Sequence, residues 1–172
     1  MIKRKTVNLE AVNALAQLIA AIGVIASLFY LAAEIRQNTR SQRMAVVDSL
    51  AHSIADLLVP LSHNPELMRA FSAVAENWYG ATEEDRLRVL PFNLALFKLF
   101  ENAWFQKRQR TLDPQQWEGW DLYIRMYYHR PGMKDWWRLR RAAFAPGFRD
   151  YVESSAPIEE LPSVTELIRG DR

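Results

Sequence analysis

Acidic and histidine side chains recur in one part of the chain at a spacing that could bind a metal ion. Asp48, His52 and Asp56 stand four residues apart, so a helix would carry all three on one face. Di-iron bundles instead use Glu-x-x-His pairs from facing helices, and this chain has only three histidines. A solvated helix face explains the row better, and we expect no metal or other cofactor.

Glu101 is the second candidate for chemistry. It falls on an apolar stripe with Phe97, Trp104 and Phe105, where a carboxylate could have a raised pKa and act as an acid or base. A buried carboxylate more often pairs with an arginine, and we favour this structural role. Three arginines are available for it: Arg125, Arg138 and Arg141.

Basic side chains gather in the C-terminal half. Five of them could form a patch for anionic lipid headgroups: Arg130, Lys134, Arg138, Arg140 and Arg141. Near a membrane, each such residue adds about 1 kcal/mol to binding. The alternative is that they pair with acidic residues of the C-terminal tail. No nucleic-acid recognition motif accompanies them, so nucleic acid is not an expected partner.

The same half of the chain is rich in aromatic residues, which have two interpretations. They could line an apolar ligand pocket, or they could fill an ordinary core and lie at a membrane interface, which we favour. The residues concerned are Trp104, Trp117, Trp120, Trp136, Trp137, Tyr123, Tyr127 and Tyr128.

Composition excludes several kinds of chemistry. The chain has no cysteine, which removes disulfides, thiolate catalysis and cysteine-ligated metals. It has only six glycines, and no phosphate-binding loop, nucleophile elbow, zincin motif or dinucleotide fingerprint occurs. The net charge of +2 is too small to attract nucleic acid over the whole surface. No catalytic residue is therefore expected.

The N-terminal stretch determines the architecture. Residues 11–33 hold twenty-three amino acids without a charge, between Glu10 and Glu34. As a helix they would reach about 34 Å, which exceeds the roughly 30 Å of a bilayer's hydrocarbon core. A signal peptide has a shorter apolar region, and a buried helix of a soluble bundle is the remaining alternative. We predict a single membrane-spanning helix.

One sector of this helix differs from the rest because it carries small and polar residues. They are Asn13, Ala16, Gln17, Ala20, Gly23 and Ser27. Small residues let helices approach closely in lipid, and amides can hydrogen-bond across a helix pair. The sector could therefore bind another transmembrane helix, either a second copy or a different membrane protein. Alternatively, alanine is simply common in such helices, and the two amides lie at headgroup level.

The remaining sequence shows helical spacing throughout and no strand pattern. We predict an all-α fold in which the transmembrane helix continues into a long helix and a bundle of about five to six helices. Helices should begin after Asn64, Thr82 and Asp113, where capping residues stand, and Pro60 should end the first helix. The predicted parts are a basic tail (1–10), the span (11–33), the bundle (34–155) and a loosely ordered acidic tail (156–172).

Several motifs along the chain resemble a group of uncharacterised bacterial proteins. The run YLAAEIRQNTRSQR follows the span, and the later motifs are NPEL, FENAWFQKRQRTLD, WEGW, PGMKDWW and FAPGFRDYV. Proteins of this group begin with one apolar helix that ends in a Tyr-Leu-Ala-x-x-Ile-Arg-Gln-Asn-Thr signature, and they have no assigned activity. The resemblance implies a single-pass protein of the inner membrane whose bundle is cytoplasmic.

The charges that flank the span do not decide its orientation. Three basic residues precede it and three follow it: Lys3, Arg4, Lys5, and Arg36, Arg40, Arg43. From all these features we expect a non-catalytic, membrane-anchored interaction module, either an accessory subunit of a larger membrane assembly or a homo-oligomer. The alternative is a membrane-tethered enzyme, or a protein that binds lipid or another apolar ligand, using the aromatic half.

Overall fold

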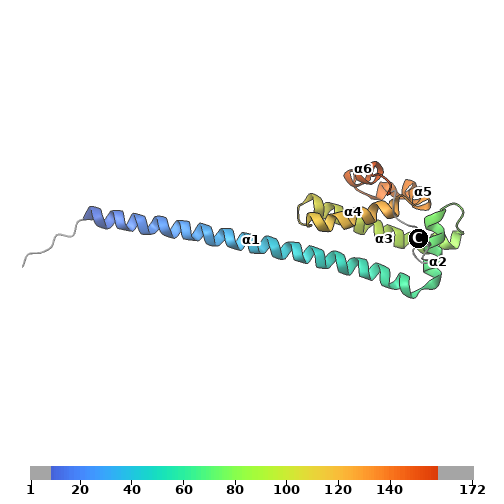
Figure 1. Ribbon diagram of the computed structural model, residues 1–172, viewed down its shortest axis with the longest axis horizontal. Helices are drawn as coiled ribbons and strands as arrows, with labels where there is room; N and C mark the ends of the chain where they lie inside the picture. The colour runs from blue at the N-terminus through green and yellow to red at the C-terminus, as the bar shows by residue number, and fades with distance from the viewer. Residues whose placement is uncertain (1–8, 159–172) are drawn as a thin grey trace, which may run out of the picture. The chain divides into compact units, whose positions relative to one another are not determined.

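Figure 1 shows the computed structural model, which describes residues 9–158. The predicted basic tail lies almost wholly outside these residues, as does most of the predicted acidic tail. The chain divides into two compact units, Met1–Gln42 and Arg43–Arg172, and each is described by itself.

All regular structure in the described residues is helical, so the predicted all-α fold is confirmed. The elements are α1 (Leu9–His63), α2 (Pro65–Glu76), α3 (Glu83–Arg108), α4 (Pro114–Tyr128), α5 (Pro131–Arg140), a short 3₁₀ helix η1 (Arg141–Ala143) and α6 (Pro146–Ser154).

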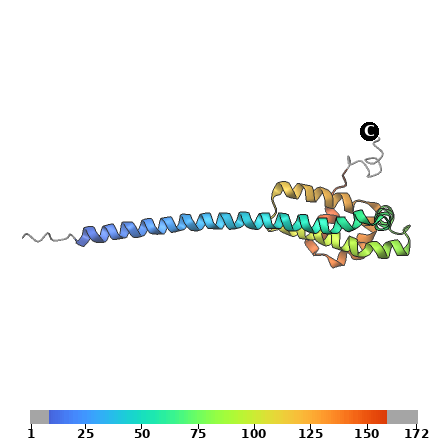
Figure 2. The same ribbon diagram turned by 90° about the horizontal axis from the view of Figure 1, so that it is seen from below.

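The N-terminal unit consists of the first part of α1, drawn in blue in Figure 2. Every side chain from residue 12 to residue 42 is exposed. α1 is the one helix in the described residues that is long and apolar enough to cross a membrane, and none of its most apolar stretch is buried. Within the described residues this stretch is therefore not buried, whereas the alternative considered from the sequence was a buried helix of a soluble bundle.

In the second unit, side-chain caps begin three of the helices where the sequence predicts. The Asn64 Oδ1 accepts the Leu67 N–H at 3.0 Å, the Thr82 Oγ1 accepts the Asp85 N–H at 3.1 Å, and the Asp113 Oδ1 accepts the Gln115 N–H at 2.9 Å. Each bond satisfies a backbone donor that the first turn of a helix leaves free.

The prolines behave differently from the prediction. Pro60 lies inside α1, which continues to His63, and Pro91 does not break α3. Pro131 and Pro146 each begin a helix. A proline is tolerated at that position because in the first turn it lacks only an N–H that would have no intrahelical partner.

The core of the second unit is built around α3. Phe97 is fully buried, and its ring centroid lies 4.9 Å from that of Trp136 and 5.4 Å from that of Trp137. Phe100 and Phe144 pack on the same ring at 5.5 and 6.3 Å. Trp136 and Trp137 are themselves 0% and 2% exposed. These aromatic residues pack against one another, which supports the core interpretation over an apolar ligand pocket.

The part of α1 that belongs to the second unit packs through a stripe that largely overlaps the predicted one, since Val47, Ile54, Leu58 and Leu61 all contact the core clusters. We expected Met44, Val47, Ala51, Ile54, Leu58 and Leu61 to face inward. Leu61 is buried and Met44 is 57% exposed, while Leu50, which the prediction omitted, is 2% exposed. Leu50 packs in a cluster with three residues of the following helices and loop, namely Leu99, Ala103 and Leu112.

Candidate functional site

The predicted partner face of the span is uncovered within the described residues. Asn13, Ala16, Gln17, Ala20, Gly23 and Ser27 are all exposed. A methyl group added at Gly23 would meet nothing within 4 Å. The Ser27 hydroxyl donates to the Gly23 carbonyl at 2.8 Å, which satisfies it within the helix, as a hydroxyl in lipid requires.

Glu101 has a structural role. It is 8% exposed, and its Oε2 accepts a hydrogen bond from the Lys98 Nζ at 2.7 Å. Its Oε1 accepts the Ala145 N–H at 2.6 Å. Ala145 is the N-cap residue of α6, so Glu101 accepts the N-cap N–H, as the glutamate of a capping box would.

The predicted arginine partner of Glu101 is wrong, because the partner is Lys98. Lys98 also donates to the Ala143 carbonyl at 2.7 Å and thereby holds the short helix η1. The three arginines have other acids nearby. Arg125 pairs with Asp121, Arg138 with Asp135 and Arg141 with Glu153.

The row of Asp48, His52 and Asp56 does not form a metal site. The His52 Nδ1 lies 2.7 Å from the backbone carbonyl of Asp48, so the imidazole bonds to its own helix. Over residues 9–158, no group of three or more histidine, aspartate or glutamate side chains could hold a metal ion.

The five residues of the predicted lipid patch do not all lie together. Lys134, Arg138 and Arg141 line a hollow of about 360 Å³. Arg140 lines a different hollow, and the guanidinium of Arg130 lies 5.9 Å from the Tyr127 ring centroid. The spacing of the three that meet explains this, because residues 134, 138 and 141 recur at the period of one helix face.

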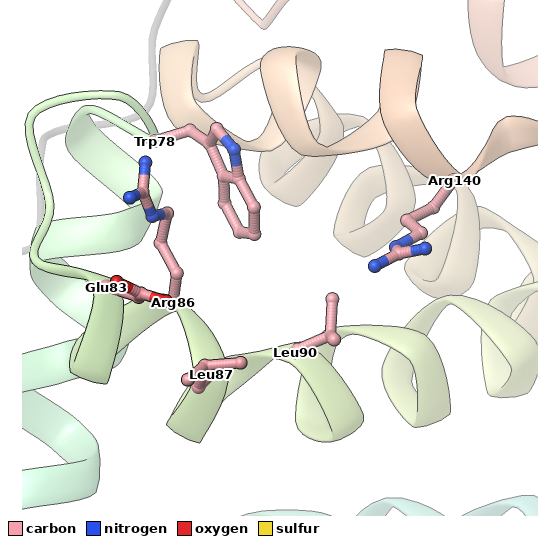
Figure 3. A pocket seen from close by; sticks show the side chains of 6 residues that line it. All are labelled: Trp78, Glu83, Arg86, Leu87, Leu90 and Arg140. Carbon is pink, nitrogen blue, oxygen red and sulfur yellow. The ribbon is translucent and has the colours of Figure 1, made fainter.

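The hollow that includes Arg140 has a volume of about 220 Å³ and is shown in Figure 3. In this view Leu87 and Leu90 of α3 form one side, Trp78 lies across from them, and Arg86 and Arg140 stand at opposite ends. Its surface is mostly apolar with a cation at each end. The sequence analysis did not predict this site, since its residues come from segments that only the tertiary fold brings together.

His129 and Ser155 form a contact that the sequence analysis also missed. The His129 Nε2 lies 3.0 Å from the Ser155 carbonyl and 3.1 Å from its hydroxyl. That hydroxyl donates to the Val152 carbonyl at 2.7 Å, and the His129 Nδ1 is buried without a hydrogen-bond partner in the part of the chain that is described. A nucleophilic serine needs its proton accepted by a histidine that a third group orients. This pair has no such third group.

Burial and nearby charges shift several pKa values in the second unit. Burial lowers the pKa of His129, and the nearby Lys134 lowers it further. Burial raises the pKa of Tyr151, whose hydroxyl donates to the Asp121 Oδ1 at 2.6 Å. Both groups are therefore neutral at pH 7.

Comparison with known proteins returns no relative. No protein-family model, no curated protein and no solved structure matches this chain. The resemblance to the uncharacterised bacterial group therefore stays a prediction, and function must be inferred from the two units themselves.

Proposed function

We propose that this protein is a non-catalytic, membrane-anchored helical module that binds another transmembrane helix, either in a second copy of itself or in a different membrane protein. The observation that carries the proposal is the apolar helix of the N-terminal unit, which is exposed from residue 12 to residue 42. An apolar surface of this extent is unfavourable in water and favourable in lipid.

Backbone chemistry supports insertion as well. The hydrocarbon core offers no hydrogen bonds, so a spanning segment must satisfy all its peptide groups internally, and a continuous helix does so. Residues 11–33 lie within one helix without a break. Membrane lipids are therefore the first partners of this protein.

A partner for the span would bind its sector of small and polar residues. Ala16, Ala20 and Gly23 allow close backbone approach, and the amides of Asn13 and Gln17 can hydrogen-bond across a helix pair. In such a complex the helical second unit acts as an accessory or structural part of a larger membrane assembly. We further propose an inner-membrane, single-pass location with a cytoplasmic bundle, in line with the family resemblance.

The alternative of a membrane-tethered enzyme has less support. Both oxygens of Glu101 accept structural hydrogen bonds, and Phe97, Trp136 and Trp137 fill the core. An enzyme that used these groups would have to give up the contacts that hold α6 and the core together.

Association of the span can be tested by photo-crosslinking in native membranes. A photoreactive residue replaces Ala20 in the proposed face, and a matched protein carries it at Ala26, outside that sector. We expect a discrete adduct, to a second copy or to one other membrane protein, from position 20 only. Equal adducts from both positions, or none from position 20, would remove the partner face.

A second measurement enlarges side chains in the proposed partner face. Ala20→Leu with Gly23→Leu should weaken association by about tenfold or more, because the backbones can no longer approach closely. Ala26→Leu with Ala33→Leu adds similar volume outside the sector and should leave association unchanged. The adduct yield from position 16 reports on both variants, and wild-type yield from the first would contradict the proposal.

A further inference from the structure

The hollow of about 360 Å³ in the second unit brings together side chains from three helices and the turn that follows α5. Tyr128 ends α4, Lys134, Trp137 and Arg138 come from α5, Arg141 begins η1, and Glu153 comes from α6. The hollow lies wholly within the second unit, so what binds there does not depend on how the span associates.

Tyr128 is the buried element of this hollow. The residue is only 9% exposed, yet its hydroxyl makes no hydrogen bond within residues 9–158 and still reaches solvent. Burial and the nearby Glu153 raise its pKa, so the phenol keeps its proton and is a donor at neutral pH. A phenol hydroxyl that opens onto a hollow and has no protein partner is free to donate to an acceptor atom of a ligand.

Lys134 lines the same hollow and lacks an anionic partner in the described part of the chain. Its Nζ lies 5.9 Å from the Tyr128 ring centroid, which orients the ammonium without neutralising it. Its three N–H donors remain available.

The single carboxylate that lines the hollow is already occupied. The Glu153 Oε1 accepts the Trp137 Nε1–H at 2.9 Å, and its Oε2 accepts a guanidinium N–H of Arg141 at 2.9 Å. Arg138 gives one N–H to Asp135, at 2.6 Å, and keeps others from its five donors. The hollow therefore has three cations against the single carboxylate among its lining residues, and several hydrogen-bond donors are left over.

We infer that this hollow binds a phosphate monoester group, held by the Tyr128 hydroxyl, the Lys134 ammonium and the guanidiniums of Arg138 and Arg141. A phosphate monoester carries a charge of about −1.5 to −2 at pH 7 and three strong acceptor oxygens. That matches a site with several converging donors and three cations better than a carboxylate does. The phosphate can belong to a lipid headgroup or to a soluble phosphate ester, because both present the same chemistry.

The test uses the full chain in nanodiscs of zwitterionic lipid. Glycerol phosphate is the soluble probe, and its dissociation constant is measured by calorimetry. Tyr128→Phe keeps the ring and removes only the hydroxyl, and Lys134→Met keeps most of the side-chain length without the charge. Each should weaken binding by at least about tenfold, the size of a lost hydrogen bond to a charged group. Arg86→Gln removes a cation from the other hollow and should leave binding unchanged.

The lipid arm replaces some zwitterionic lipid with phosphatidic acid or, at equal surface charge, with phosphatidylglycerol. Competition between glycerol phosphate and phosphatidic acid, but not phosphatidylglycerol, supports a shared monoester site in lipid. Soluble binding without such competition supports a soluble ester as the ligand. Binding of glycerol phosphate that is absent, or that the three substitutions reduce equally, overturns the inference. Unchanged unfolding temperatures of the ligand-free variants confirm that the fold is intact.

Discussion

Leu18 and Leu50 lie on the same helix, yet they are 58% and 2% exposed. The first belongs to a stretch that is mostly apolar and has no charge, and the second to an apolar stripe between the acids Asp48 and Asp56. A stripe with a polar opposite face is typical of a helix that packs on one side. A helix that is apolar all round requires an apolar environment on all sides, and in the N-terminal unit the protein does not provide one.

The glycines of the two units also differ, in how much space surrounds them. A methyl group at Gly23 would meet nothing within 4 Å, whereas one at Gly132 would lie 1.8 Å from the Val74 carbonyl oxygen. In the second unit, α5 begins so close to the backbone of α2 that only glycine fits. The two units therefore differ in which residues they tolerate. The first restricts the polarity of a side chain, and the second restricts its volume.

Charged substitutions in the proposed membrane helix should have the largest effect, which is loss of the protein from the membrane. Ile22→Arg with Ile25→Arg places two guanidiniums near the centre of the proposed membrane helix. On an insertion scale each costs about 2.5–3.5 kcal/mol there. We expect most of the protein to leave the membrane pellet on alkaline carbonate extraction, where the wild type stays.

The matched control for this experiment is Asn38→Arg, which adds a charge to an exposed position of α1 outside residues 11–33. It should leave extraction unchanged. Retention of the double variant to the wild-type extent would mean that the apolar helix is not held by lipid, and the contrast between the two units would lose its explanation.

Volume should dominate in the second unit. Gly132→Ala forces its methyl group against the carbonyl oxygens of Val74 and Ala75. Overpacking of this kind costs about 1–3 kcal/mol and sometimes more, and a clash with backbone places this case at the upper end. The unfolding midpoint, followed by near-ultraviolet circular dichroism of the aromatic core, should fall accordingly.

Two other glycines are controls for the volume argument. Gly119 lies inside α4 with nothing within 4 Å of an added methyl, so Gly119→Ala should stabilise the unit by about 0.5–1 kcal/mol. Gly23→Ala changes only the first unit and should not move the midpoint of the aromatic signal. A destabilisation by Gly119→Ala as large as that by Gly132→Ala would contradict the packing argument, because an added methyl group at Gly119 meets nothing within 4 Å.

Local signals explain which parts of the fold could be predicted. The starts of α2, α3 and α4 follow from Asn64, Thr82 and Asp113, since a cap acts within three residues of itself. The span follows from a run of uncharged residues, which is also local. The fold class and the starts of these three helices were therefore accessible from sequence.

Features that depend on neighbours in the tertiary structure could not be predicted in the same way. Helical spacing identifies a stripe but not how far it is turned, so Leu50 was missed. Glu101 was predicted to pair with an arginine, but its contacts depend on the path of residues 143–145 after α5. The hollow around Tyr128 needs the ends of α4, α5 and α6 to meet, which no sequence spacing specifies.

Acid should produce the smallest difference between the units. In the second unit, hydrogen bonds from Arg69 and then Thr82 lower the pKa of Asp85 from its ordinary value of 3.8. Arg69 donates to Asp85 at 2.9 and 3.3 Å. Because the folded-state pKa lies below the unfolded one, the ionised carboxylate adds stability above the unfolded pKa of about 4, and this is lost as the pH falls through the folded pKa.

We therefore expect the urea midpoint of the second unit to fall as the pH drops below about 4, and Asp85→Asn to flatten that part of the profile. At pH 7 the variant should be less stable than the wild type, and the two should converge in acid. Residues 11–33 contain no acid, histidine or basic residue, so carbonate-resistant anchoring tested after acid exposure should not change. A wild-type acid profile in Asp85→Asn would assign the pH dependence to other carboxylates, since the ion pair with Arg69 would then contribute nothing measurable.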